Sequence, residues 1–327
     1  MPAEIPAFEL LEVLSQGFLM QEGVSGVSVT WGSAPRVRVY VEHESYEPFV
    51  PREIGGYPVE VVVTGRFYTL SSLPTRSRLR PIPGGVSIGI PDGPTGTLAC
   101  RVYDARTGRR LMLSNRHVME GGPGTPVIQP GRHDGGRYPE DVVGYVLRYA
   151  EVRPPPFVNR VDAALAAPVD ESVLSDEILG IGAVSGAEPP REGAVVVKVG
   201  RTTGYTEGTV VDTRASVKVF GYPFGYAILS DQVVVMPSIA EPGDSGSLVV
   251  DKETGRAVGL LFAGSERATA VNRMDLVLSI LGVSLVPGAR AEVARGVDYG
   301  SVALGLVPVA VVGTVVGLGE LAKRARR

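Results

Sequence analysis

The sequence predicts a mainly β protein in which a long region of short strands follows a small α+β unit. Glycine and proline number 42 and 26 among the 327 residues, about a fifth of the chain, and they separate short valine-rich runs. Turns at such close intervals are typical of strands joined by hairpins. Helical segments between the runs are scarce, which favours a closed β architecture over alternating strands and helices.

The small α+β domain is expected over residues 1–72. Residues 8–21 place apolar side chains at helical spacing, which predicts a helix. Three strand-like runs follow, at 24–31, 36–42 and 57–65. Residues 32–35, Gly-Ser-Ala-Pro, are typical of a hairpin turn between the first two runs. One helix and about three strands are enough for a small domain.

A linker and a larger β domain are expected next. Residues 73–84 are polar, basic and proline-containing, which is typical of a connection between domains. The larger domain is expected over 85–287, with Arg-Pro-Pro-Pro at 153–156 in a loop because proline disrupts central strands. Its strand-like runs are 86–90, 97–104, 109–115, 141–149, 194–200, 208–213, 232–236, 246–251 and 257–262.

Charge and cysteine content limit the classes of partner and compartment. The net charge of −3 does not predict a basic face for nucleic acid. Cys100 is the single cysteine, so no intrachain disulfide forms, and a reducing compartment is permitted. The first residues, MPAEIPAFELLEVL, lack the basic region of a signal peptide. We therefore expect a cytoplasmic protein.

The segment Gly243-Asp244-Ser245-Gly246-Ser247 predicts a serine nucleophile on a tight turn. Acyl transfer needs backbone N–H groups directed at the developing oxyanion. A glycine two residues before the serine lets its N–H and that of Ser245 point the same way without a Cβ clash. The alternative is an ordinary β-turn, because Gly, Asp and Ser are common in turns.

His117 is the candidate general base. The chain has three histidines, and His117 closes the strand-like run at 109–115, whereas His133 lies in a polar loop and His43 in the first domain. Imidazole is the side chain whose ordinary pKa suits proton transfer near neutrality. The alternative for His117 alone is a structural histidine, and the other two are expected to be exposed bystanders.

Asp162 is the candidate carboxylate that would orient the imidazole. It stands before the small apolar run Ala163–Ala166, where a buried acid needs a hydrogen-bond donor. Asp141 and Asp170 lie in more polar surroundings and are weaker candidates. The alternative for Asp162 is a turn residue at the start of a strand.

Together these segments resemble the trypsin/chymotrypsin-like serine proteases. The order His, Asp, Ser matches that family, with 45 residues from His117 to Asp162 and 83 from Asp162 to Ser245. The resemblance implies two β-barrels, one carrying His117 and Asp162 and the other Ser245. It also implies an endopeptidase that acts on proteins or peptides through an acyl-enzyme, with the N–H groups of Gly243 and Ser245 as oxyanion hole. No metal or organic cofactor is implied.

The resemblance narrows to the plant NARROW LEAF-type proteases and their prokaryotic trypsin-like relatives. It rests on RVRVYVE, LMLSNRHV, IQPGRHDGG, KVGRTTGYTEGTV and PGDSGSLVVD, and runs from about residue 20 to 285. Relatives of this type lead us to expect a homo-oligomer. Two residues depart from patterns in the family: Ser247 replaces a common glycine, and Arg116 precedes the histidine where some relatives have Asn. Arg116 would lower the pKa of His117 if the two charges lay close.

The resemblance also suggests the primary substrate pocket. Ile239, six residues before the nucleophile, would form its floor, and Phe262, Ala263 and Gly264 its wall. An apolar floor offers no carboxylate to Arg or Lys, so we expect apolar side chains before the cleaved bond. Glu241 would change this preference if it turned inward.

Three further features have competing interpretations. Gly200-Arg201-Thr202-Thr203-Gly204 is expected to be a hairpin turn, with a substrate-cleft or subunit-contact loop as the alternative. Within the same fold, a binding or scaffold protein with an inactive or conditionally assembled triad is the competing function. An esterase of the α/β-hydrolase type is rejected, because Asp and His would have to follow the serine.

The tail over 288–327 contains nineteen residues without charge, 301–319, followed soon by KRARR. As a helix this run could just span the apolar core of a bilayer, about 30 Å thick. Pro308 and several glycines weaken an isolated helix, and a cytoplasmic protein would place KRARR against the positive-inside tendency. We therefore favour packing between subunits over membrane association.

Overall fold

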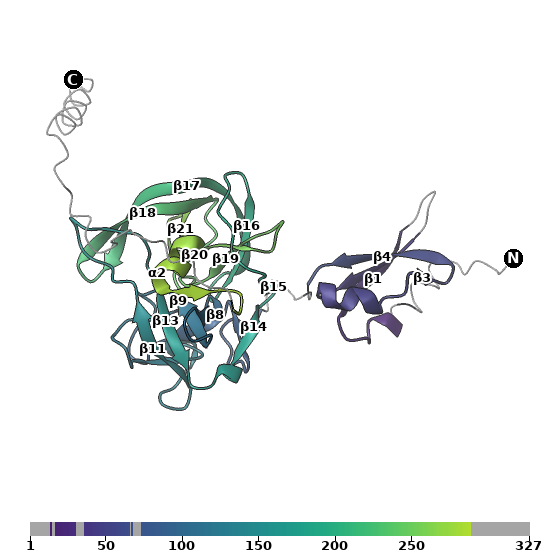
Figure 1. Cartoon of the computed structure of the whole chain (residues 1–327), viewed down its shortest axis with the longest axis horizontal. Coiled ribbons are helices and arrows are strands. Elements are labelled where there is room, and N and C mark those ends of the chain that lie inside the picture. The colour runs from purple at the N-terminus through teal and green to yellow at the C-terminus, as the bar shows by residue number, and fades with distance from the viewer. Residues whose placement is uncertain (1–13, 15–16, 31–35, 66, 68–72, 289–327) are drawn as a thin grey trace, which may run out of the picture.

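The computed structural model describes residues 14, 17–30, 36–65, 67 and 73–288. Figure 1 shows two bodies along the chain, a small sheet and a larger β body. Within the predicted helix at 8–21, Leu14, Gly17 and Phe18 are helical, and most of that range lies outside the described residues. The predicted turn at 32–35 and the apolar run at 301–319 also lie outside them.

The small body is a four-stranded sheet in the order β1-β2-β4-β3. Its elements are β1 (Val24–Thr30), β2 (Arg36–Val41), the 3-10 helix η1 (Glu44–Phe49), β3 (Glu53–Ile54) and β4 (Tyr57–Val63). β2 pairs antiparallel with β1 and parallel with β4. Alternate residues Val37, Val39 and Val41 of β2 are fully buried, as the period of a strand requires. The three predicted strands are confirmed, whereas β3 and η1 were not predicted.

The segment 73–84, predicted as a linker, belongs instead to the larger body. Ile82 is buried and begins β5 (Ile82–Gly84), which pairs parallel with β14 (Leu174–Ile178). The hydroxyl of Thr75 donates to the carbonyl oxygen of Arg201 at 3.0 Å. Burial of Ile82, the pairing of β5 with β14 and the Thr75 hydrogen bond hold the segment against the larger body despite its polar composition.

The first half of the larger body is an eight-stranded sheet in the order β22-β8-β9-β13-β11-β10-β6-β7. Its strands are β6 (Ser87–Gly89), β7 (Thr95–Thr97), β8 (Cys100–Asp104), β9 (Arg110–Ser114), β10 (Pro126–Ile128), β11 (Val142–Tyr149), β13 (Ala164–Pro168) and β22 (Val283–Ser284). Short 3-10 helices η2 (Arg132–Asp134) and η3 (Glu171–Val173) connect strands, and β15 (Gly182–Ala183) pairs antiparallel with β14 in a three-stranded sheet with β5.

The second half is a closed barrel. Its strands are β16 (Val195–Gly200), β17 (Gly204–Tyr222), β18 (Gly225–Met236), β19 (Leu248–Asp251), β20 (Ala257–Gly264) and β21 (Thr269–Arg273), with β12 (Val158–Asn159) added parallel to β18. Closure follows because β21 pairs with β20 on one side and with β18 on the other. β17 and β18 form a long curved hairpin (Figure 1).

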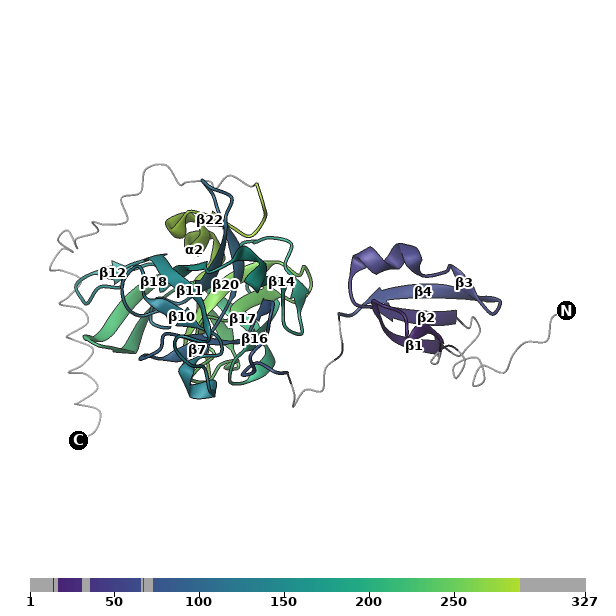
Figure 2. The ribbon, with the colours of Figure 1, turned by 90° about the horizontal axis from the view of Figure 1, so that it is seen from below.

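The two halves share a hydrophobic core. Leu113 and Leu165 of the first half pack in one cluster with Val197 and Leu260 of the second. Helix α2 (Met274–Leu281) contributes to the same cluster and lies beside β22 (Figure 2), and β22 returns to pair with β8. The chain thus crosses between the halves at β12, after β13 and again at β22, which fixes the surfaces where they meet.

Each strand-like run predicted between 86 and 262 contains an observed strand, and residues 153–156 form a loop. The predicted mainly β fold is confirmed, and the second half is a closed barrel. Within the described ranges, no helix is long and apolar enough to cross a membrane.

Candidate active site

His117 and Asp162 come together because their strands are neighbours. β9 and β13 pair antiparallel, with Ser114 opposite Ala164, and the two candidate residues lie just beyond this pair. Asn115 follows β9 and its side-chain amide donates to the carbonyl oxygen of Asp162 at 2.7 Å. His117 Nδ1 lies 2.9 Å from Asp162 Oδ2. The Nδ1 proton therefore points at the carboxylate, and Nε2 remains free to accept a proton.

The Asp162 carboxylate is fully buried and accepts four hydrogen bonds. Oδ1 accepts the backbone N–H of Arg116 at 2.7 Å and that of His117 at 3.2 Å. Oδ2 accepts His117 Nδ1 and, at 2.6 Å, the hydroxyl of Tyr222. A buried carboxylate with every lone pair occupied stays ionised at low cost. Tyr222 was not predicted, because it lies in a turn-like Gly-Tyr-Pro-Phe-Gly segment far along the chain.

The pKa values of the two groups move apart. Burial raises the pKa of Asp162, but the charge and hydrogen bond of His117 and the bond from Tyr222 outweigh burial, so the pKa lies below its usual value. Burial lowers the pKa of His117, but the Asp162 carboxylate and its hydrogen bond outweigh burial, so the pKa lies above its usual 6.5. The pair is arranged to stabilise an imidazolium.

Ser245 lies on a turn between β18 and β19 that needs two glycines. Gly243 and Gly246 have φ values of 102° and 97°, where side chains with a Cβ are strained. A Cβ on Gly246 would also collide with the carbonyl oxygen of Thr97. The backbone N–H of Thr97 donates to the carbonyl oxygen of Ser245 at 2.8 Å, so this turn is joined to β7 in the first half of the larger body.

Two N–H groups of this turn have no acceptor. Asp244 N–H donates to Glu241 O, Gly246 N–H to Leu261 O and Ser247 N–H to Asp244 O, at 2.9–3.0 Å. Among the described residues, the N–H groups of Gly243 and Ser245 make no hydrogen bond. Free donors on a glycine turn are what an oxyanion site requires.

The hydroxyl of Ser245 does not contact His117 through a hydrogen bond in the part of the chain that the structure describes. Its partner is the carbonyl oxygen of Phe262, at 3.4 Å. Phe262 and His117 line the same cavity, so the residue that accepts the Ser245 hydroxyl borders the same space as His117. Hydrogen bonds between nucleophile and base are often long or misaligned without substrate.

A family model for the trypsin-like peptidase domain matches residues 95–260, about half of the chain. The chain belongs to the trypsin-like peptidase family. The matched range contains His117, Asp162 and Ser245. No curated protein sequence matches the chain significantly.

Among solved structures, this trypsin-like peptidase is similar to three bacterial proteases. Nocardiopsis protease is 22% identical, over 62% of this chain and 97% of its own, with a TM-score of 0.47. Thermobifida fusca protease A is 20% identical, over 63% and 99%, with a TM-score of 0.47. Cellulomonas bogoriensis chymotrypsin is 17% identical, over 63% and 98%, with a TM-score of 0.42.

Next to Ser245, the peptidase buries an ion pair. Asp244 and Lys198 are both fully buried, and Lys198 Nζ lies 3.3 Å from Asp244 Oδ2. Asp244 Oδ1 accepts the backbone N–H groups of Thr202 and Thr203 at 2.8 and 3.1 Å, and Oδ2 accepts the Thr203 hydroxyl at 2.8 Å. Burial lowers the pKa of Lys198, against the opposing effect of Asp244. We call Lys198, Thr202 and Thr203 the Asp244 cradle.

The Gly200–Gly204 segment is the predicted hairpin turn, because Gly200 pairs with Gly204 at the end of β16 and β17. Its threonines belong to the Asp244 cradle, which neither alternative anticipated. The guanidinium of Arg201 in the same turn donates two hydrogen bonds to Asp134 of η2, at 2.6 and 2.7 Å. These bonds connect the turn to the first half of the larger body.

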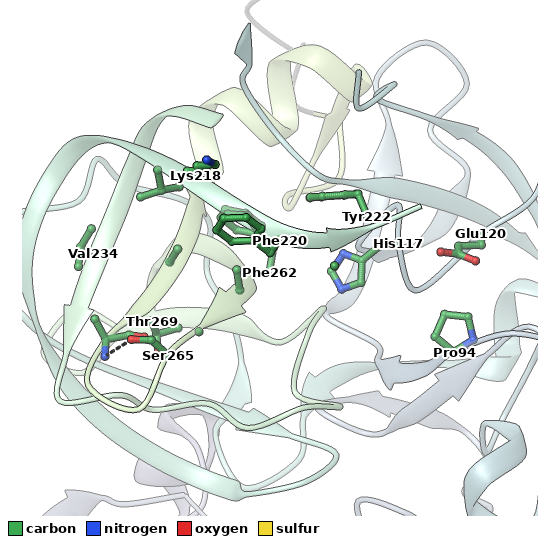
Figure 3. Close-up of a pocket in the computed structure, with 17 residues that line it drawn as sticks. Pro94, His117, Glu120, Lys218, Phe220, Tyr222, Val234, Phe262, Ser265 and Thr269 are labelled. Atoms are coloured by element: carbon green, nitrogen blue, oxygen red, sulfur yellow. Dashed lines mark hydrogen bonds between the residues drawn. The ribbon is translucent and has the colours of Figure 1, made fainter. Parts of the chain in front are cut away.

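A cavity of about 680 Å³ extends from His117 along the β17–β18 hairpin. Phe262, Ala263 and Gly264 line it, as predicted for the wall strand. Residues 217–222 of β17 form the facing wall. Figure 3 shows His117 between the aromatic side chains Phe262 and Tyr222 and, on its other side, Glu120 and Pro94.

Ile239 does not line this cavity, contrary to the prediction that it forms the floor. Its side chain is 2% exposed and packs with Val210, Val235 and other valines inside the second barrel. An isoleucine gains more from this apolar core than from a cavity open to water. Thr269 lines the cavity instead, and its hydroxyl accepts the N–H of Ile239 at 2.9 Å. Glu241 is exposed and is not part of the cavity lining.

Arg116 is not among the groups that shift the pKa of His117, so the condition set for its effect is not met. Its guanidinium lies 4.0 Å from the ring centre of Tyr149, and Nη1 donates to Met119 O at 3.2 Å. These contacts direct the charge away from the imidazole. His43 and His133 are exposed, as predicted.

Proposed function

We propose that this trypsin-like peptidase is a serine endopeptidase that cleaves proteins or peptides through an acyl-enzyme. The observation that carries the proposal is the 2.9 Å contact between His117 and the buried Asp162, beside a glycine turn that carries Ser245 and two free N–H donors. Nucleophile, base, orienting acid and oxyanion donors are the four parts that acyl transfer requires.

Each residue has a distinct role in the proposed reaction. Ser245 Oγ attacks the peptide carbonyl while His117 Nε2 takes the hydroxyl proton. The resulting imidazolium is stabilised by Asp162, in agreement with the raised pKa of His117. The N–H groups of Gly243 and Ser245 hold the oxyanion. His117 then protonates the leaving amine and activates the water that releases the acyl group.

The competing function is a binding or scaffold protein of the same fold. It is favoured by one observation, the hydrogen bond of the Ser245 hydroxyl to Phe262 O instead of to His117. The free Gly243 and Ser245 N–H groups favour the enzyme, because a scaffold has no use for unpaired donors.

Hydrolysis of a fluorescence-quenched peptide library separates the two. Ser245→Ala and His117→Ala should each lose up to about 10⁶-fold in kcat. Asp162→Asn should lose about 10⁴-fold with the fold intact. His133→Ala is the matched control for an exposed histidine and should retain wild-type turnover. Wild-type turnover in Ser245→Ala would refute the endopeptidase, and no turnover by any form would favour the scaffold.

Finer relationships and assembly are also proposals. We propose kinship with the NARROW LEAF-type proteases and their prokaryotic relatives, on the likeness of the segments KVGRTTGYTEGTV and PGDSGSLVVD. We propose a homo-oligomer in which residues 301–319 pack between subunits, and the cytoplasmic location stays a prediction.

A further inference from the structure

The β17–β18 hairpin contributes a side chain to the carboxylate that orients His117. Tyr222 is the last residue of β17, and its hydroxyl donates to Asp162 Oδ2 at 2.6 Å. The same oxygen accepts His117 Nδ1 at 2.9 Å. Burial and the Asp162 carboxylate raise the pKa of Tyr222 well above its usual value, so the hydroxyl keeps its proton and acts as a donor. Tyr222 and His117 thus share one acceptor atom.

No other described residue can replace this donor at Oδ2. Phe262 of β20 lies in the same cavity but has no hydrogen-bonding group on its side chain. The backbone N–H groups of Arg116 and His117 are directed at Oδ1. Without the Tyr222 hydroxyl, Oδ2 would keep His117 as its one partner. A fully buried carboxylate that loses a donor is free to rotate or to draw a water inward.

The ring of Tyr222 is held from both sides. It meets the His117 ring edge-on, with centres 6.5 Å apart and planes at 84°. On the hairpin tip it stacks on Phe224, with centres 5.4 Å apart and planes at 4°. Phe224 is itself 40% exposed, so the buried contacts of Tyr222 are those with Asp162 and His117.

Tyr222 also borders two cavities. The larger one, about 680 Å³, lies on the side of Phe262 (Figure 3). A smaller one of about 320 Å³ is lined by His117, Tyr149, Tyr222 and Phe224. A substrate chain in either cavity would therefore rest against the residue that holds Asp162.

We propose that Tyr222 is a positioning residue that ties the tip of the β17–β18 hairpin to the orientation of His117 through Asp162. The role in catalysis rests on the proposed endopeptidase function. Displacement of the hairpin tip would withdraw the hydroxyl, leave His117 as the one partner of Asp162 Oδ2 and put more of the carboxylate charge on the imidazole. A substrate bound against the hairpin would keep the Tyr222 hydroxyl on Asp162, and with it the orientation of Asp162 and His117.

Other charged groups around the pair do not duplicate this contact. Glu120 follows His117 and favours its protonated form. Arg116 is stacked on Tyr149, and Lys218 of β17 lies 4.0 Å from the ring centre of Tyr226. Glu151 borders the smaller cavity and pairs with Arg153. Loss of the Tyr222 hydroxyl therefore changes one interaction of Oδ2 and leaves these charges in place.

The direct test is Tyr222→Phe, with Tyr226→Phe as a control that removes a hydroxyl from the same hairpin. Tyr222→Phe should lower kcat about 10-fold to 100-fold, the factor of a hydrogen bond to a charged group, with little change in KM. The carboxylate then acts on the imidazole alone, so the acidic limb of kcat/KM should move upward by about half a pH unit. Tyr226→Phe should match wild type in both, and equal profiles for both variants and wild type would overturn the proposal.

A second measurement does not depend on activity. In a Ser245→Ala background, the His117 imidazole can be titrated by NMR, with the exposed His43 and His133 as internal references. Tyr222→Phe should raise the pKa of His117, and Phe224→Ala should shift it in the same direction by less. An unchanged pKa of His117 in Tyr222→Phe would overturn the proposal. An unchanged pKa of His117 in Phe224→Ala would overturn the link to the hairpin tip. Failure of the wild type to hydrolyse peptides would refute the endopeptidase but leave this titration decisive.

Discussion

The ammonium group of Lys198 lies 3.3 Å from the carboxylate of Asp244, and neither side chain is exposed to solvent. Asp244 immediately precedes Ser245, and its carboxylate accepts three further bonds from the Gly200–Gly204 turn. The buried Asp244 carboxylate therefore holds the turn that carries Ser245 and the two free N–H groups. This pair couples folding stability to the geometry of the proposed oxyanion site.

Lys198→Met should destabilise the protein and lower kcat together. Loss of one partner leaves the Asp244 charge buried and unpaired, which costs about 3–5 kcal/mol of unfolding free energy. The control is Lys252→Met, whose pair with Glu207 is about half exposed and should cost less than about 1 kcal/mol. Urea unfolding followed by far-UV circular dichroism gives the free energy of unfolding. The kcat of each variant is measured in parallel. Equal, small losses in the two variants would contradict a structural role for the cradle.

The pH dependence follows from the raised pKa of His117. The proposed base works only when the imidazole is neutral, so kcat/KM should rise with pH through the pKa of His117 in the free enzyme. Because Asp162 raises that pKa, the midpoint should lie above the usual 6.5. Initial rates across pH 5–9 at constant ionic strength would measure it. A midpoint below 6.5 would contradict the stabilised imidazolium.

The strand pattern and the three motifs were predictable because each depends on local sequence. Valine-rich runs between glycines marked the barrel strands, and the order of His117, Asp162 and Ser245 placed two of them on neighbouring strands. The Asp244 cradle left a signal that was not used: Lys198 is a lone charge within the apolar run at 194–200. A charge in a central strand must find a partner, and Asp244 provides it.

Tyr222, Ile239 and the segment 73–84 were missed or misplaced because their environment is set by distant residues. Tyr222 reaches Asp162 through a hairpin whose length and curvature no local pattern reports. Ile239 is drawn into the barrel by valines of other strands. The polar segment 73–84 is fixed by pairing of β5 with β14, about ninety residues later.

The cavity predicts a preference for apolar side chains just before the cleaved bond. Its walls include Val217, Val219, Val234 and Phe262, and among the described residues of the lining Glu120 is the one carboxylate. Discrimination among apolar side chains should be modest, about 10-fold to 200-fold per methylene. Ala268→Asp would add a carboxylate to the lining and should raise relative cleavage after Arg and Lys. Dominant cleavage after Arg or Lys by the wild type in a peptide library would contradict the prediction.

The apolar tail should affect assembly and leave the proposed site unchanged. Truncation after Gly288 removes residues outside the described structure and keeps α2 and β22. We expect a soluble, smaller oligomer by light scattering, with unchanged reactivity at Ser245. Recovery of the full-length protein in membranes, resistant to carbonate wash and released by detergent, would show instead that 301–319 anchors it.

The central claim is that Ser245 is a nucleophile activated by His117. Fluorophosphonate labelling followed by peptide mass spectrometry tests it without knowledge of the substrate. We predict one adduct per chain, on Ser245, formed rapidly by the wild type and lost in both Ser245→Ala and His117→Ala. Adduct formation at the same rate in His117→Ala, or a wild type that does not react, would contradict the account.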